Sequence, residues 1–155
     1  RMGAGQIAVT ARSTQRKELA LNMGADLFVE PSDDPPAAAI EAMGGPADIV
    51  FECVGASGLL QQSILSVRMR GTVVVAGLCF HADSIVPAAM VVREARIQPA
   101  AFYSLREFEH ATEPLDQGAV EPAMMVTDTV SLTDMPPVFE ALRTRTTQCK
   151  VMVKP

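Results

Sequence analysis

The sequence has few of the residues from which metal sites and disulfide frameworks are built. Its 155 residues include three cysteines, Cys53, Cys79 and Cys149, and two histidines, His81 and His110. The cysteines are odd in number, widely spaced and form no CxxC pair, and neither histidine has a ligand partner three or four residues away. We therefore expect no metal site in this chain, and we interpret the cysteines as reduced, mostly buried thiols.

Clusters of Lys and Arg and long apolar runs are also missing. A net charge of −5 with scattered cations argues against a nucleic acid or an anionic membrane as partner. No apolar run approaches the roughly 18 to 20 residues of a spanning helix, and the N-terminus has no signal pattern. We expect a soluble, cytoplasmic protein. Because the chain begins with Arg1 and not with an initiator Met, an N-terminal signal peptide that has been removed stays an alternative.

Short apolar runs alternate with helical patterns from the start of the chain. The run "QIAVTA" predicts a strand, Ser13 is a good N-cap, and "TQRKELALNM" predicts a helix that ends near Gly24. A second strand is expected in "DLFVEP", and a short helix in "PPAAAIEAMGG".

The same alternation continues through the rest of the chain. The apolar run "ADIVFECVG", interrupted at Glu52, is typical of a strand buried on both faces of a parallel sheet. The segment "SGLLQQSILSVRM" predicts a helix that reaches Val67, and it precedes a buried strand in "GTVVVAGL" and an edge strand around Pro99. Helices are expected in "LREFEHATEPL" and "LTDMPPVFEALRT", and a last strand in "CKVMVKP". The pattern predicts an α/β fold with a Rossmann-type, doubly wound parallel sheet.

The residues that follow each predicted strand deserve separate inspection, because ligands of open parallel sheets bind beyond the carboxyl ends of the strands. They are 11–13, 53–55 and 76–78. Gly55 and Gly77 would each let a ligand approach the backbone, and each would equally serve a tight turn. Their recurrence at successive strand ends favours a binding site.

A second glycine pattern lies at the N-terminus. Residues Gly3 to Ala8 match the G-x-G-x-x-A phosphate-binding fingerprint, and Glu30 lies 25 residues beyond Gly5, near the place of a ribose-binding acid. This reading would make residues 6–23 one helix. The β-branched run "IAVTA" and the lack of a strand before Gly3 favour a strand instead.

Four motifs carry a family resemblance when taken in order. They are "R-x-x-x-A-x-x-x-GAD" at 16–26, "GGPADIVFECVG" at 44–55, "MRGTVVVAGL" at 69–78 and the terminal "KVMVKP". The chain resembles, over nearly its whole length, the cofactor-binding domain of the medium-chain dehydrogenase/reductase family, most closely the zinc-dependent alcohol and polyol dehydrogenase branch.

The resemblance implies a hydride transfer between an alcohol or ketone and a nicotinamide cofactor, with zinc as Lewis acid. It also implies a truncated Rossmann domain. The family's first strand, glycine-rich loop and zinc-bearing N-terminal domain would all precede Gln6, so this chain alone is expected to be inactive and to hold neither catalytic nor zinc-binding residues. Residues 1–120 would be a partial dinucleotide-binding domain, and residues 121–155 the return segment of the other domain.

Ala11 and Arg12 suggest which nicotinamide cofactor is bound. A carboxylate at the end of this strand would bind the adenosine ribose and repel the 2′-phosphate of NADP, and Ala11 stands in its place. Arg12, Ser13 and Lys17 would offer charge and hydrogen bonds to that phosphate. NADP is therefore favoured over NAD. The alternative is that Arg12 is a solvated residue of the helix's first turn.

The resemblance implies further contacts with the dinucleotide. Lys150 would lie near the cofactor pyrophosphate. Residues of three later segments would line the rest of the cofactor: Cys53, Val54 and Gly55; Ala76, Gly77 and Leu78; and Phe102, next to Ala101. An outward-facing Lys150 on an edge strand is an equal alternative.

Two other classes of protein remain open. The chain would fit a zinc-independent medium-chain reductase of the quinone or enoyl type, or a non-catalytic nucleotide-binding module. The sequence does not identify the alcohol or ketone.

The missing first strand has a consequence for assembly. Without it, the strands at Ile7 and Ile49 would face each other across an open slot of about 10 Å, twice the usual strand spacing. Unpaired buried backbone is costly. We therefore expect the two strands to pair directly, or a second copy of the chain to fill the slot. The family resemblance implies a homodimer or higher oligomer through the edge near residues 85–99.

Overall fold

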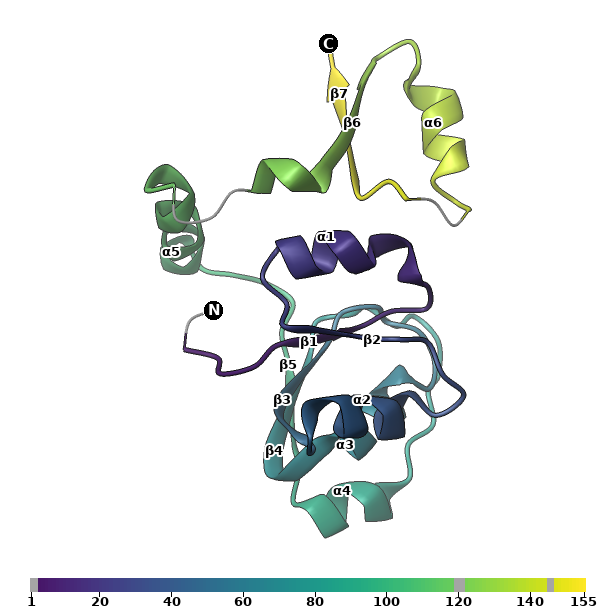
Figure 1. Cartoon of the computed structure of the whole chain (residues 1–155), viewed down its shortest axis with the longest axis vertical. Coiled ribbons are helices and arrows are strands. Elements are labelled where there is room, and N and C mark those ends of the chain that lie inside the picture. The colour runs from purple at the N-terminus through teal and green to yellow at the C-terminus, as the bar shows by residue number, and fades with distance from the viewer. Residues whose placement is uncertain (1–2, 119–121, 145–146) are drawn as a thin grey trace. The chain divides into compact units, whose positions relative to one another are not determined.

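The computed structural model describes residues 3–118, 122–144 and 147–155. The chain divides into two units. Unit 1 contains Arg1–Arg12 and Asp26–Phe102, and unit 2 contains Ser13–Ala25 and Tyr103–Pro155. Each unit is an α/β assembly built on parallel strands (Figure 1). No helix of the described residues has both the length and the apolar character needed to cross a membrane.

Unit 1 holds two parallel sheets. Strands β1 (Ala8–Thr10) and β2 (Leu27–Val29) form the first, and β3 (Ala47–Glu52), β4 (Val67–Val75) and β5 (Arg96–Pro99) form the second in that order. Asp26 closes the start of the first sheet, because its backbone N–H donates to the Ile7 carbonyl and its carboxylate accepts from the Ile7 N–H at 2.8 Å. The predicted parallel strands are confirmed. The N-terminal fingerprint helix is rejected, because β1 lies inside residues 6–23.

Of the two expected ways to fill the slot, direct pairing of the strands at Ile7 and Ile49 is wrong, and filling by a second copy of the chain stays a prediction. In the described chain β1 bonds to β2 and β3 bonds to β4, with no ladder between β1 and β3. The two sheets are connected through their helices. Helix α2 (Pro35–Met43) packs on both strands of the first sheet and on α3 (Leu59–Ser66), which in turn covers β3 and β4 (Figure 1). Helix packing therefore links the two sheets, and no backbone ladder joins them among the described residues.

The core of unit 1 lies between the second sheet and the helices α3 and α4 (Pro87–Arg93). Ile64, Val67 and Val73 are fully buried there. Val67 opens β4 instead of ending the helix, since its backbone is extended. The opposite face of β3 is bare, with Ile49 and Phe51 exposed, so the expectation that β3 is buried on both faces is wrong for this chain.

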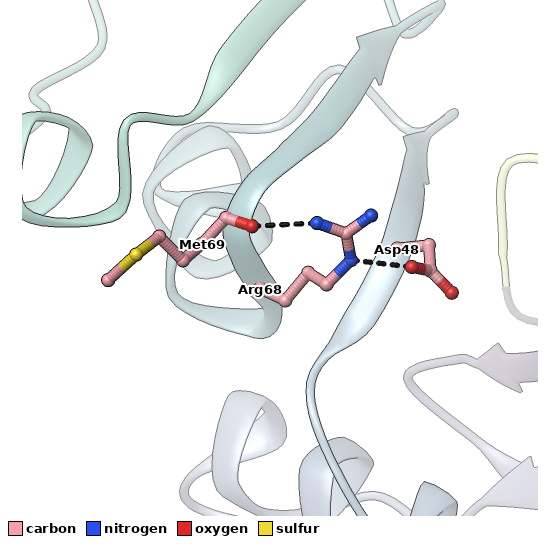
Figure 2. Close-up of polar contacts among 3 residues, drawn as sticks. All are labelled: Asp48, Arg68 and Met69. Carbon is pink, nitrogen blue, oxygen red and sulfur yellow. Dashed lines mark hydrogen bonds and ion pairs between the residues drawn. The ribbon is translucent and has the colours of Figure 1, made fainter.

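An arginine links the amino end of β3 to β4. Arg68 donates from Nε to the Asp48 carboxylate at 2.5 Å and from a terminal nitrogen to the Met69 carbonyl at 2.8 Å (Figure 2). The β3–β4 register shifts between Ala47 and Ile49, next to this contact. The guanidinium therefore satisfies a carbonyl and a carboxylate where the ladder is irregular.

Unit 2 is built on the parallel pair β6 (Val126–Ser131) and β7 (Lys150–Lys154). Its helical elements are η1 (Thr14–Arg16), α1 (Lys17–Asn22), α5 (Leu105–Asp116), η2 (Pro122–Met125) and α6 (Met135–Ala141). Arg16 donates to the Gln148 carbonyl at 2.7 Å and so joins the early segment to the end of the chain. Strand β6 was not predicted from the sequence. The predicted domain boundary at residue 120 falls outside the described residues and stays a prediction.

Candidate functional site at the carboxyl ends of β3 and β4

The turns that follow β3 and β4 are in direct backbone contact. Gly55 has a left-handed φ of 71°, and a Cβ atom added there would lie 2.5 Å from the carbonyl carbon of Leu78. A Cβ added at Gly77 would lie 2.2 Å from the Gly55 nitrogen. A side chain fits at neither position, so the two glycines that the sequence analysis singled out are needed for this close approach.

Glu52, the last residue of β3, holds both turns. Its backbone carbonyl accepts hydrogen bonds from the N–H groups of Ala76 and Gly77, each at 2.8 Å. Its carboxylate Oε1 accepts from the N–H groups of Val54 and Gly55 at 2.8 and 2.9 Å. Only 7% of the residue is exposed. A single buried residue therefore ties the two turns into one surface.

Exposed side chains project from this surface. Val54 and Leu78 are each 67% exposed, and Cys53 is also exposed. Beyond β5, the Ala100 N–H donates to the Val75 carbonyl at 2.9 Å, and Phe102 is almost fully exposed two residues later. The edge thus offers apolar groups on a rigid backbone floor.

The segment after Leu78 is anchored at the start of α3. Asp83 Oδ1 accepts from the Gly58 N–H at 2.8 Å, and Gln61 Oε1 accepts from the Val86 N–H at 2.8 Å. These two bonds hold the connection between β4 and α4 beside the N-terminus of α3. Sequence reasoning assigned no role to Asp83 or Gln61.

The residues predicted to bind the adenosine end of the dinucleotide follow β1. Ala11 and Arg12 are exposed, and Arg12 forms no ion pair with a described residue. Ser13 precedes η1 with an extended backbone and makes no side-chain cap bond, so the predicted N-cap position is right and the capping hydrogen bond is not formed.

Lys17 and Lys150 belong to unit 2. Lys17 opens α1 and is half-buried, while Lys150 is exposed at the start of β7, where its carbonyl accepts from the Thr127 hydroxyl at 3.3 Å. Their roles as cofactor contacts stay predictions.

The described residues contain no metal centre. No group of three or more His, Cys, Asp or Glu side chains in residues 3–118, 122–144 and 147–155 is arranged to hold an ion. These residues therefore do not fit a zinc ion, and no chemical step is assigned to one here. Cys53, Cys79 and Cys149 are free thiols, but the first two are exposed, so the expectation of mostly buried cysteines is wrong.

Sequence reasoning also assigned no role to Glu52. It was visible as a carboxylate that follows the apolar run Ile49–Phe51, three residues before a glycine. A carboxylate in such a run needs hydrogen-bond donors, because an unpaired buried charge is too costly. The backbone amides of a following glycine turn are the nearest donors, and this combination was the available signal.

Parallel strands joined by helices, whose carboxyl ends meet in glycine turns, define an open α/β fold, a class in which ligands bind at that edge. Known proteins place the chain within this class. Residues 1–117 match the family model described as "Zinc-binding dehydrogenase". The sequence is 36% identical to the probable alcohol dehydrogenase adh of Mycobacterium tuberculosis over 75% of this chain and 34% of that protein. It is 29% identical to sheep (Ovis aries) sorbitol dehydrogenase over 99% of this chain and 44% of that protein.

Solved structures agree with this assignment. The chain matches 2R,3R-butanediol dehydrogenase from Bacillus subtilis with a TM-score of 0.86 and 28% identity, over 99% of this chain and 44% of that one. It matches a Sinorhizobium meliloti dehydrogenase, described as zinc-binding and bound to NADP, with a TM-score of 0.86 and 27% identity. This match covers 99% of this chain and 46% of that one. The chain belongs to the zinc-binding dehydrogenase family, as its motifs predicted. It spans less than half the length of these relatives.

Proposed function

We propose that this chain forms the nicotinamide-cofactor-binding part of an oxidoreductase that interconverts an alcohol and the corresponding aldehyde or ketone, with NADP as the preferred cofactor. The observation that carries the proposal is the contact between the Gly55 and Gly77 turns at the carboxyl ends of β3 and β4. Relatives named as sorbitol, alcohol and butanediol dehydrogenases support the reaction class.

The residues of this chain would position the dinucleotide. When bound, the nicotinamide would supply the acceptor for a hydride from the alcohol carbon, and the hydroxyl proton would be released to solvent. The Gly55 and Gly77 turns would provide a flat backbone floor, and Val54, Leu78 and Phe102 would exclude water from it. The Glu52 carboxylate at this edge is buried and accepts hydrogen bonds from the N–H groups of Val54 and Gly55, so the role proposed for these residues is to bind and orient the cofactor.

The preference for NADP rests on Ala11 and Arg12. Ala11 carries no charge to repel a 2′-phosphate, and the exposed guanidinium of Arg12 is not engaged by any described carboxylate. Ser13 and Lys17 would add a hydroxyl and a second cation. An NADP complex of the Sinorhizobium meliloti relative shows that this cofactor is bound within the family.

Calorimetric titration of the purified chain with NADP and with NAD tests the proposal. We expect both to bind and NADP to bind more tightly, because the 2′-phosphate adds a charge-assisted contact. ATP serves as the control for a site that recognises only an adenine nucleotide. Binding of ATP as tight as that of NADP would indicate a general nucleotide module, and binding of neither dinucleotide would overturn the proposal.

A further inference from the structure

The carboxylate of Glu52 occupies the space that separates the two turns of the site. Its Oε2 lies 2.4 Å from the position that a Cβ on Gly77 would take, and its Oε1 is bonded to the N–H groups of Val54 and Gly55. With its backbone carbonyl also engaged by Ala76 and Gly77, this residue accepts four hydrogen bonds from the two turns. In the described chain it is the one buried residue with a charge, since the other buried polar residue is Ser63.

The hydrogen bonds determine what the first turn can offer a ligand. The N–H groups of Val54 and Gly55 point to the Glu52 carboxylate, so they are not donors for an anionic ligand. The turn instead presents the Val54 side chain, which is 67% exposed. A carboxylate that accepts two backbone N–H bonds fixes the orientation of both peptide groups, and with them the direction of the side chain between them.

We propose that Glu52 is a positioning residue of the cofactor site. It holds the Val54–Gly55 turn against Leu78 so that the dinucleotide meets a preformed surface. This inference rests on the function proposed above. Because Glu52 acts on the shared part of the surface and not on the 2′-phosphate end, its loss is expected to weaken NADP and NAD by the same factor.

Three variants test the role of Glu52. Glu52→Ala removes the acceptor, and Glu52→Gln keeps one oxygen for the two amides while it removes the charge. Val73→Ala is the matched control, because it destabilises the core of the same sheet from a fully buried position that lies opposite Val50 in the ladder. Two quantities are measured for each: the hydrogen exchange of the Val54 and Gly55 amides in the free chain, and the affinities for both dinucleotides.

We expect Glu52→Ala to accelerate exchange at these two amides and to weaken both cofactors by roughly tenfold, the scale of a lost hydrogen bond to a charged group. Glu52→Gln should weaken both by roughly threefold, since neutral hydrogen bonds are about half as strong. Val73→Ala should leave the affinities unchanged below its melting temperature. If the alanine variant does not fold, the glutamine variant carries the test.

The outcomes are distinguishable. Unchanged exchange at Val54 and Gly55, or faster exchange with unchanged affinity, would overturn the positioning role while the proposed function stands. A loss confined to NADP would also overturn it. Absence of dinucleotide binding in the wild-type chain would overturn the proposed function itself, and the positioning role with it.

Discussion

Arg70 and Glu94 form an ion pair in which both residues have a left-handed backbone. The Nε of Arg70 lies 2.7 Å from Oε2 of Glu94, and their φ angles are 59° and 47°. Left-handed φ costs an ordinary L-residue roughly 1–2 kcal/mol, whereas an exposed ion pair contributes about 0–1 kcal/mol. With side chains 71% and 56% exposed, the pair does not offset the strain of the two residues.

Replacing Arg70 by glycine is therefore expected to stabilise the chain by about 0.5–1 kcal/mol, because glycine adopts this φ without a Cβ clash. Urea unfolding measures the change. Glu94→Gln is the control, since it removes the ion pair and keeps non-glycine residues at both left-handed positions. It should alter the free energy of unfolding by less than about 0.5 kcal/mol. A less stable Arg70→Gly variant would show that the ion pair outweighs the strain.

The core of unit 1 depends on Ile64. Because this side chain is fully buried between α3 and the sheet, Ile64→Ala should lower the free energy of unfolding by about 2–5 kcal/mol and Ile64→Val by about 0.5–1.5 kcal/mol. Chemical denaturation followed by circular dichroism measures both. Val91→Ala, at a position 74% exposed on α4, is the control and should have little effect. Equal losses at positions 64 and 91 would contradict this description of the core.

The N-terminus of α5 is expected to respond to acid. The pKa of Glu107 is lowered from its ordinary value of 4.5, first by the backbone N–H of Ser104 and then by the Ser104 hydroxyl. A lowered pKa in the folded state means that the capping box stabilises the helix above the ordinary pKa and loses this contribution as the pH falls through the folded value.

An NMR titration of the Glu107 carboxyl group measures this pKa directly. Ser104→Ala should raise it toward 4.5 without reaching it, because the hydroxyl is lost and the backbone N–H remains. The control is Thr112→Ala, which removes a hydroxyl bonded to the Glu109 carbonyl on the same helix and leaves the cap intact. A Glu107 pKa that is the same in the wild-type chain and in Ser104→Ala would show that the Ser104 hydroxyl does not contribute to lowering it.

Arg12→Ala tests which part of the cofactor this residue recognises. In the complete enzyme, we expect the variant to weaken the binding of NADP by about 1.5–3 kcal/mol, the scale of a charge-assisted hydrogen bond, and to leave that of NAD nearly unchanged. Calorimetric titration gives both values. Arg143→Ala removes another exposed cation, one paired with Glu140 on α6, and should leave both affinities unchanged. Equal losses for NADP and NAD in Arg12→Ala would show that Arg12 does not bind the 2′-phosphate.

The open strand edges lead to a prediction about assembly. Among the described residues, β3 and β5 each bond only to β4, so each has one free edge, and Ile49 and Phe51 are exposed on β3. Pairing of a free edge with a second copy would satisfy these backbone groups. We predict at least a dimer in light scattering. A mass of 16.5 kDa would contradict it.

Much of the fold was predictable from local patterns. The helices that became α2 and α5 carried their own start and stop signals: Asp34 and Ser104 cap the N-termini through side-chain bonds, and Gly44 takes the left-handed conformation at the end of α2. Strand β6 was missed because "VTDTVS" lacks a continuous apolar run, and it becomes a strand by pairing with β7, more than twenty residues later.

The candidate site was predictable only in part. Gly55 and Gly77 could be selected because each follows an apolar strand and parallel strands align their carboxyl ends. Their contact, and the Glu52 carboxylate between them, required the register of β3 against β4, in which Glu52 lies opposite Val75.

The sequence by itself determined the succession and parallel direction of β1 to β5, the family and the glycine positions, because these depend on periodicity and on short motifs. Only the tertiary structure decided that the sheets of β1 and β3 stay separate, that one face of β3 is bare and that a buried carboxylate joins two turns. Each of these depends on which segments distant in the chain pack together, and local residue patterns carry no information about that choice.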